Sequence, residues 1–242
     1  MPDSRLSLSI LVGSMCSSVI FRYLCGMSES TLFSTEIKER IKQGLALPVM
    51  EHFYTIQGEG FYSGLPSYFL RLGGCDVGCP WCDVKDSWDQ EKHPVFSVEE
   101  IVTWITQTKA NKLVVTGGEP LMYSLDVLCE LLHIKGIDCH IETSGAHSSS
   151  GSWDWFTLSP KKRKLPKLEN YKKANELKVV IARANDFEFA EEQALLVAEN
   201  CKLYIQPEWS RESAILKDII AYVKENPKWS ISLQTHKYMD IP

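Results

Sequence analysis

Three cysteines stand close together in the sequence, at Cys75, Cys79 and Cys82, with the spacing CxxxCxxC. Thiolates are soft ligands, and three of them so close together can hold a zinc ion or an iron–sulfur cluster. A closed zinc site needs a fourth Cys or His ligand at its own spacing, and the nearest candidate, His93, lies in a polar segment without a second motif. A [4Fe-4S] cluster held by three thiolates leaves one iron free for a small molecule, so both kinds of site stay open on these residues alone.

The composition is that of an ordinary globular protein. The 242 residues are 44% hydrophobic and 24% charged, which is enough for one domain with a large core. The formal net charge of -5 argues against broad electrostatic binding to nucleic acid. Eight cysteines in this length do not indicate a disulfide framework, so we expect a reducing, cytoplasmic environment. Three of them, Cys129, Cys139 and Cys201, lie in apolar patterns and are expected to be small buried side chains.

The N-terminal segment differs from the rest. Residues 6–24 are apolar but interrupted by serines and Arg22, which makes them a poor membrane span. With Arg5 ahead of it, this run faintly resembles a signal peptide, but export would conflict with an oxygen-sensitive cluster. We therefore expect translation to start at Met27, with residues 1–47 forming an extension and residues 48–242 a single domain.

Strands and helices alternate regularly after Pro94. Ser97 and Glu100 form a capping box before an apolar-periodic helix. Strands are expected at residues 51–56, 67–72, 112–116, 139–142, 155–158, 176–181, 202–205 and 230–233. The alternation implies a parallel sheet with helical crossovers. About six βα units are too few for an eight-fold barrel, so we expect an α/β fold with an open or reduced (β/α) barrel.

Short polar motifs follow nearly every strand. In barrels of βα units this edge carries the active site. We therefore expect seven residues to converge on one rim: Gln57, Cys75, Gly118, Glu142, Ser159, Gln206 and His236.

Several of these motifs suggest particular chemistry. Gly118 lets a ligand approach the backbone closely, and Glu119 suits an ammonium group. Arg71, in an otherwise apolar strand, can clamp a carboxylate through two hydrogen bonds. His236 is expected to be structural. The basic run at residues 161–167 is expected to be a solvated loop, the alternative being contact with an anionic ligand.

Together these motifs resemble a known family. The cysteine triplet followed by Gly-Gly-Glu-Pro resembles the radical S-adenosylmethionine enzymes. The order and spacing of further motifs make residues 48–242 similar to the 7-carboxy-7-deazaguanine synthases. These motifs are residues 55–60, Arg71, and residues 75–83, 116–120, 141–145, 159–161 and 234–238.

The resemblance implies a radical SAM core and a carbon–nitrogen lyase activity. The family converts 6-carboxy-5,6,7,8-tetrahydropterin to 7-carboxy-7-deazaguanine and ammonia, on the route to queuosine and other deazapurines. The implied cofactors are a [4Fe-4S] cluster, S-adenosylmethionine and magnesium. The implied partners are an electron donor such as flavodoxin or ferredoxin and a second copy of the chain in a homodimer, with no nucleic acid and no membrane.

The resemblance also assigns residues to roles. Cys75, Cys79 and Cys82 would hold the cluster. Residues implied to border S-adenosylmethionine are Trp81, Cys82, Asp83, Gly118, Glu142, Ser144, Ser159, Pro160, Lys161 and Gln206. Residues implied to contact the substrate are Ile56, Gln57, Gly58, Arg71, Thr116 and Pro242.

One position departs from the family pattern. Many members carry Thr or Ser after the Cys-Asp pair, where the hydroxyl binds magnesium, but Val84 has no side-chain oxygen. We therefore expect weaker magnesium dependence than in Thr-bearing relatives. Two alternative functions are a glycyl-radical-enzyme activase, which also uses CxxxCxxC, and a zinc-stabilised binding module.

Overall fold

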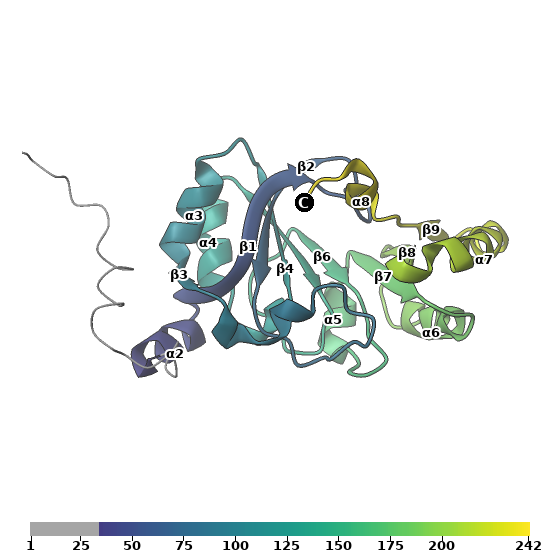
Figure 1. Cartoon of the computed structure of the whole chain (residues 1–242), viewed down its shortest axis with the longest axis horizontal. Coiled ribbons are helices and arrows are strands. Elements are labelled where there is room, and N and C mark those ends of the chain that lie inside the picture. Colours follow the sequence, from purple (N-terminus) through teal and green to yellow (C-terminus); the bar gives the residue numbers. More distant parts are fainter. Residues whose placement is uncertain (1–33) are drawn as a thin grey trace, which may run out of the picture. The chain divides into compact units, whose positions relative to one another are not determined.

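The fold is built on one twisted sheet, seen in a computed structural model that describes residues 34–242 (Figure 1). Within these residues nine strands occur in the order β3-β1-β2-β4-β5-β6-β7-β8-β9. Their bounds are β1 Ala46–Ile56, β2 Pro66–Leu72, β3 Val95–Ser97, β4 Lys112–Gly117, β5 Asp138–Thr143, β6 Trp155–Leu158, β7 Glu176–Ile181, β8 Lys202–Pro207 and β9 Trp229–Ile231. The strands from β2 to β9 in this order are all parallel, which confirms the α/β partial barrel.

The expectation of a wholly parallel sheet is wrong at one edge. β1 runs antiparallel to both β2 and β3. Only residues 57–65 separate β1 from β2, and a parallel connection would need a crossover of about a dozen or more residues. β1 also starts at Ala46 and pairs there with β3, so strand pairing begins two residues before Pro48, where the expected domain begins. The expected start at Met27 lies outside the described residues and stays a prediction.

Helices connect most of the parallel strands. The α-helices are α2 Thr35–Lys42, α3 Val98–Thr106, α4 Asp126–Ile134, α5 Leu168–Lys173, α6 Asn185–Ala194, α7 Glu212–Glu225 and α8 Thr235–Met239. Residues 34–242 also contain the short 3-10 helices η1 Lys85–Trp88, η2 Gln90–Lys92, η3 Pro120–Met122 and η4 Trp209–Arg211. The predicted capping box is confirmed at α3, where the Ser97 hydroxyl accepts from the Glu100 amide and the Glu100 carboxylate accepts from the Ser97 amide. No helix in residues 34–242 has the length and apolar character that crossing a membrane requires.

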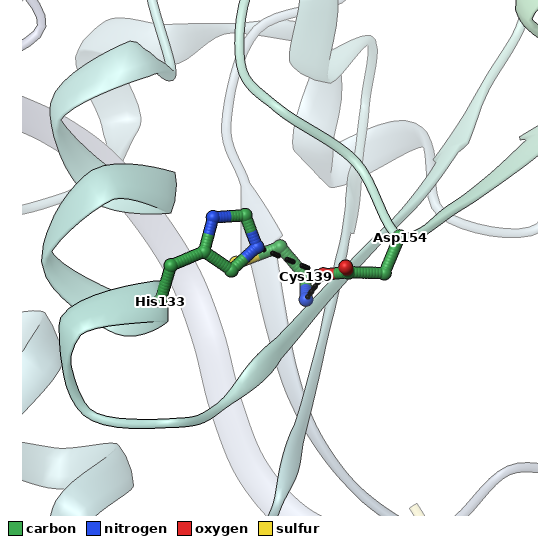
Figure 2. A group of neighbouring side chains, drawn as sticks. All are labelled: His133, Cys139 and Asp154. Carbon is green, nitrogen blue, oxygen red and sulfur yellow. Dashed lines mark hydrogen bonds and ion pairs between the residues drawn. The ribbon is translucent and has the colours of Figure 1, made fainter.

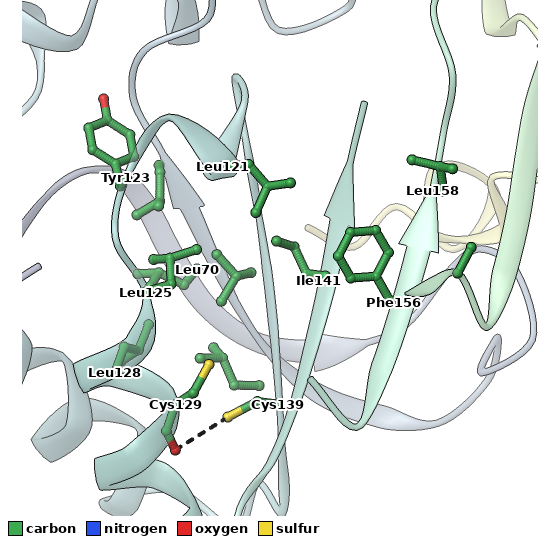
Figure 3. Close-up of a cluster of buried hydrophobic side chains, with 14 of the residues drawn as sticks. Leu70, Leu121, Tyr123, Leu125, Leu128, Cys129, Cys139, Ile141, Phe156 and Leu158 are labelled. Carbon is green, nitrogen blue, oxygen red and sulfur yellow. Dashed lines mark hydrogen bonds between the residues drawn. The ribbon is translucent and has the colours of Figure 1, made fainter. Parts of the chain in front are cut away.

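The core lies between the sheet and these helices (Figure 3). Leu128 of α4 belongs to the same buried cluster as Leu70 of β2, Ile141 of β5 and Phe156 of β6, and all four are at most 1% exposed. Cys129, Cys139 and Cys201 are buried and free, as the sequence predicted. This packing fixes the positions of the strands relative to one another. It therefore also fixes the positions of their carboxyl ends.

Candidate active site

A cavity of about 340 Å³ opens at the carboxyl ends of the parallel strands. It is lined by all seven residues that we expected to converge on this rim. Of the residues assigned to cofactor or substrate by resemblance, every one except Pro160 lines the cavity. Pro160 is buried between Ser159 and Lys161, which both line it.

The loop that carries the three cysteines is anchored by hydrogen bonds at its start. The amide of Gly74 donates to Ser87 O over 2.6 Å, and the amide of Cys75 donates to Trp88 O over 3.1 Å. The Tyr123 hydroxyl donates to Gly73 O over 2.5 Å. Gly74 has a φ of +99°, and a Cβ there would lie 2.3 Å from the Tyr123 hydroxyl, so glycine is required. The cysteines therefore leave β2 in a defined direction.

Within residues 34–242 the sulfurs of the three cysteines are not gathered as closely as a single ion requires. Zinc bound by three thiolates would bring the sulfurs to about 3.8 Å from one another. Within residues 34–242, however, Cys75, Cys79 and Cys82 are not among the groups whose ligand atoms lie within 4.8 Å of one another. A cubane cluster, in which each thiolate binds a different iron, needs such wider spacing. Burial raises the pKa of Cys75 and of Cys79, and the nearby charge of Lys161 partly offsets it for Cys79, so cluster binding would release protons.

A different group does meet the distance criterion for a single ion: His133, Cys139 and Asp154 (Figure 2). It lies at the amino end of β5, at the opposite end of the strand from the cavity. The Asp154 carboxylate interacts with His133 Nε2 over 2.8 Å and accepts from the Cys139 amide over 2.7 Å. The interaction of the Cys139 thiol with Cys129, together with burial, raises the pKa of Cys139. A thiol kept protonated in the core is a poor ligand, so these contacts tie α4 to the sheet.

Glu119 joins two of the loops at the cavity. Its side chain is 1% exposed, and one carboxylate oxygen accepts from the Leu121 amide over 3.0 Å and from the Thr143 hydroxyl over 2.5 Å. The other oxygen accepts from the Ser144 amide over 2.9 Å and from the Ser144 hydroxyl. These four donors lock the end of β4 to the end of β5.

Lys178 is a cavity residue that sequence reasoning missed. Its side chain is 5% exposed, and its ammonium group contacts the Glu59 carboxylate and lies 3.0 Å from Glu142 Oε2. Gln57 Nε2 donates to Glu142 Oε1 over 2.9 Å, and Gln234 Nε2 donates to Glu59 Oε1 over 2.8 Å. A lysine inside an apolar predicted strand was the signal that could have identified it, because a buried ammonium requires a partner.

The opposite charges of Lys178 and Glu59 keep both side chains ionised although they are buried. Burial alone would raise the pKa of Glu59, but the charge and hydrogen bond of Lys178 outweigh it and lower this pKa to about 2. Burial alone would lower the pKa of Lys178, but the charges of Glu142 and Glu59 raise it. One ammonium and two carboxylates thus stand together at the cavity wall and orient the amide of Gln57.

Arg71 also has a partner that the sequence analysis did not name. Its Nε donates to Glu51 Oε1 over 2.6 Å, across the antiparallel pair in which Glu51 faces Arg71. Within the described residues no hydrogen bond engages the terminal nitrogens of Arg71, so they can clamp a carboxylate in the cavity. The cross-strand position could not be read from the sequence, because it depends on the β1–β2 register.

Lys161 corrects the expectation of a solvated basic loop. It lines the cavity, where its ammonium group donates to Ser159 O over 2.8 Å and to Ser159 Oγ over 2.6 Å. It also lies 5.5 Å from the centre of the Trp81 ring, and burial lowers its pKa. Lys162, Arg163 and Lys167 of the same run are exposed, as expected.

The C-terminal segment closes one side of the cavity. α8 returns to the tips of β1 and β2 (Figure 1), where the Thr235 amide donates to Gly58 O over 3.0 Å. A Cβ on Gly58 would lie 2.2 Å from His236 Nδ1, so the imidazole packs directly on the glycine. This contact supports the structural role expected for His236, although the side chain also lines the cavity.

The fold and the site together define a radical SAM enzyme: a partial barrel with a three-cysteine loop at the carboxyl ends of its parallel strands. Residues 70–187 match the family model described as the radical SAM superfamily. The chain belongs, within it, to the 7-carboxy-7-deazaguanine synthase family.

Curated relatives with this name support the assignment. The protein of Flavobacterium psychrophilum is 52% identical, over 87% of this chain and 100% of the relative. That of Synechocystis sp. is 46% identical, over 81% and 94% of the two chains. That of Escherichia coli is 33% identical, over 80% and 98%. The crystal structure of QueE from Escherichia coli superposes with a TM-score of 0.70 at 29% sequence identity, covering 83% of this chain and 99% of that chain.

Proposed function

We propose that this protein is a radical SAM lyase that converts 6-carboxy-5,6,7,8-tetrahydropterin to 7-carboxy-7-deazaguanine and ammonia, a step toward queuosine and related 7-deazapurines. The observation that carries the proposal is that Cys75, Cys79, Cys82 and Arg71 all open into one cavity. A cluster at the cysteines would therefore face a carboxylate clamped by Arg71. The family membership supports the same substrate.

The cofactors fit residues that line the cavity. When bound, the [4Fe-4S] cluster and S-adenosylmethionine supply one-electron, hydrogen-abstracting chemistry. Cys75, Cys79 and Cys82 would hold the cluster. Residues proposed to border S-adenosylmethionine are Trp81, Asp83, Gly118, Glu142, Ser144, Ser159, Pro160, Lys161 and Gln206. Among these, Gly118 offers bare backbone at the end of β4, and Lys161 covers the face of Trp81.

The substrate fits the side of the cavity formed by β1, β2 and β4. Arg71 binds the 6-carboxylate with its terminal nitrogens while Glu51 holds its Nε. Thr116 faces Arg71 in the parallel β2–β4 register and offers a hydroxyl to the same ligand. Gln57 can offer the pterin edge its second Nε2 hydrogen and the second lone pair of its amide oxygen, because Glu142 accepts from Nε2 over 2.9 Å and the Glu59 amide donates to the oxygen over 3.1 Å. Further substrate contacts are proposed for Ile56, Gly58 and Pro242.

We propose that magnesium assists the reaction but has few ligands from the protein. Val84 lines the cavity without a side-chain oxygen, and its carbonyl accepts from the Ser87 hydroxyl over 2.6 Å. The Asp83 carboxylate is engaged by Lys237 over 2.9 Å. Magnesium prefers several oxygen ligands and retains waters, so it would bind chiefly through substrate and water.

The cellular setting is proposed on chemical grounds. An oxygen-sensitive cluster and free cysteines suit the reducing cytoplasm. We propose that a flavodoxin or ferredoxin supplies the electron and that the protein works as a homodimer, as implied by the family. The net charge of -5 supports a function without nucleic acid.

Anaerobic reconstitution tests this function. The reconstituted protein is incubated with S-adenosylmethionine, dithionite and the carboxytetrahydropterin, and the products are identified by mass. We expect 7-carboxy-7-deazaguanine, together with broad absorption near roughly 400 nm from the cluster. Cys79→Ala should lose both the absorption and the product, whereas Cys201→Ala, which removes a buried thiol outside the cavity, should keep both.

The outcomes separate the alternatives. Product formation by iron-free protein, or by Cys79→Ala, would overturn the proposal. Bound zinc without colour would favour the binding module instead. Cleavage of S-adenosylmethionine only in the presence of a protein partner, with no pterin turnover, would favour the activase.

A further inference from the structure

The loop after β6 carries an unusual concentration of positive charge. Residues 161–167 contain five cations and no carboxylate, in a chain whose formal net charge is -5. A cationic segment on an acidic protein is a local feature of the surface, and it does not follow from the overall composition.

Three of these five cations lie in the cavity or form ion pairs within the protein. Lys161 lies in the cavity, while Lys162 pairs with Asp186 and Lys164 pairs with Asp76, each over 2.6 Å. The remaining two, Arg163 and Lys167, are exposed, and no carboxylate of residues 34–242 lies within 4.0 Å of either. Their charge is therefore available to a partner.

This loop lies directly against the cysteine loop. The guanidinium carbon of Arg163 is 3.9 Å from the position that a Cβ on Gly78 would occupy, and Gly78 precedes the cluster ligand Cys79. Lys164 binds Asp76, the residue that follows Cys75. Arg163 thus stands beside the cysteine loop, while Lys167 donates to the hydroxyl of Ser148, which follows His147, a contact of Asp76.

Apolar side chains accompany these charges. Leu165 is 56% exposed and Leu168, at the start of α5, is 72% exposed. We call Arg163, Leu165, Lys167 and Leu168 the basic–apolar patch. Charged residues around a small apolar centre are typical of transient protein–protein interfaces.

We propose that the basic–apolar patch is the docking surface for an acidic, low-potential one-electron carrier protein. The inference rests on the proposed function, because only a cluster at the cysteine loop would need an electron there. The carrier gives up one electron and the cluster accepts it, and no atom or proton is transferred. Electron transfer weakens steeply with distance, so a carrier must dock beside the cysteine loop. The exposed cations would steer it there, and a small interface lets it leave again.

Reversing the charge of the patch in the holoenzyme tests this. Arg163→Glu/Lys167→Glu is compared with Lys109→Glu/Lys135→Glu, which makes the same charge change at two exposed lysines far from the cysteine loop in the fold. Reduced flavodoxin and dithionite serve as the two reductants. Three readouts are the affinity for oxidised flavodoxin, the rate at which cluster absorption bleaches, and product formation.

We expect the patch variant to bind flavodoxin about tenfold more weakly at low salt and to be reduced by it correspondingly more slowly. Bleaching by dithionite should stay within about twofold of wild type, because a small reductant needs no docking surface. Leu165→Ser/Leu168→Ser should also slow reduction by flavodoxin. The control pair should match wild type, and only the wild-type and control proteins should lose affinity as salt rises.

Equal flavodoxin affinity and equal bleaching in the patch variant and the control would overturn the docking surface. Loss of dithionite bleaching in the patch variant would also overturn it, because the change would then act on the cluster site itself. Failure of the proposed function looks different: the wild-type cluster would bleach with dithionite but form no deazapurine product.

Discussion

At the scale of single residues, the charge balance of the cavity depends on Lys178. It is the cation that contacts both Glu59 and Glu142, and these carboxylates orient Gln57 and accept from Gln234. A buried carboxylate without a cation is costly and takes up a proton instead. Lys178 therefore acts as a positioning residue for the Gln57 amide, which we propose to face the pterin.

Lys178→Met should weaken both the fold and substrate binding. Loss of one partner from a buried ion pair costs about 3–5 kcal/mol of unfolding free energy. Without the ammonium group the pKa of Glu59 rises from about 2, so the acid limb of the pH–rate profile should move to higher pH. KM for the pterin should rise by about tenfold through the misoriented Gln57. Lys112→Met, at another buried lysine that does not line the cavity, should leave the pH–rate profile unchanged; the same shift in both variants would contradict the assignment.

Val84 is expected to set the magnesium response. Val84→Thr introduces a hydroxyl that can bind magnesium, so magnesium should stimulate this variant several-fold more than the wild type, by roughly 1 kcal/mol of added metal binding. Val84→Ala changes the size without adding oxygen and serves as the control. The measurement is the initial rate as a function of magnesium concentration, and equal stimulation of all three proteins would refute the expectation.

At the scale of elements, the site depends on how closely two loops approach. The loop after β4 meets the cysteine loop after β2 at Gly118, whose amide donates to Leu72 O over 3.0 Å, while the Glu119 amide donates to Gly74 O over 2.8 Å. A Cβ on Gly118 would lie 2.2 Å from Gly74 O and 2.8 Å from the Cβ of Cys75. There is no room for a side chain, so this glycine sets the distance between the two loops.

Gly118→Ala should therefore displace the cysteine loop. We expect a reconstituted variant with less iron and an altered visible spectrum, since the clash involves backbone that cannot rotate away. Gly136→Ala is the matched control: its φ of +71° costs about 1 kcal/mol of stability, but no atom lies within 4 Å of the added Cβ. If both variants bind iron as wild type does, the close approach of the two loops is not required for the cluster.

At the scale of the whole molecule, a buried histidine makes the stability of the folded protein depend on pH. His140 on β5 is 5% exposed and lies 4.7 Å, centre to centre, from the Tyr62 ring. Burial, with a smaller contribution from the charge of Lys112, lowers the pKa of His140 to about 4. The folded state thus favours the neutral imidazole, whereas the unfolded chain takes up a proton near pH 6.5.

Stability should consequently fall on acidification. The contribution of His140 is fully present above about pH 6.5 and is lost as the pH falls to about 4, on the order of 3 kcal/mol. His140→Phe keeps a ring but cannot titrate, so its midpoint of chemical unfolding should change less between pH 7 and pH 4 than that of wild type. His52→Phe, at an exposed histidine of β1 that forms no ion pair within residues 34–242, controls for the loss of a histidine. Equal pH dependence in wild type and His140→Phe would contradict the role assigned to burial.

The sequence alone determined the local features of this protein. The CxxxCxxC loop, the Gly-Gly-Glu-Pro turn, the capping box of α3 and the positions along the chain of the strands other than β3 depend on neighbouring residues, and so could be read directly. Because parallel strands all end at the same edge, even the convergence of Cys75, Glu142 and Gln206 could be predicted. Gln57 follows the antiparallel strand β1, so its contact with Glu142 over 2.9 Å does not follow from that rule.

Only the tertiary structure decided which distant residues meet. The antiparallel pairing of β1 with β2 depends on the short connection between these two strands. The Glu51–Arg71 pair depends on the register of the same two strands. The ion pairs of Lys178 join positions 119 and 36 residues apart, and no local pattern encodes them. Lys161 is likewise buried in the cavity, although it belongs to a basic run that the sequence predicts to be a solvated loop. Contacts of this kind follow from packing, because a buried charge must find its partner wherever the folded chain places it.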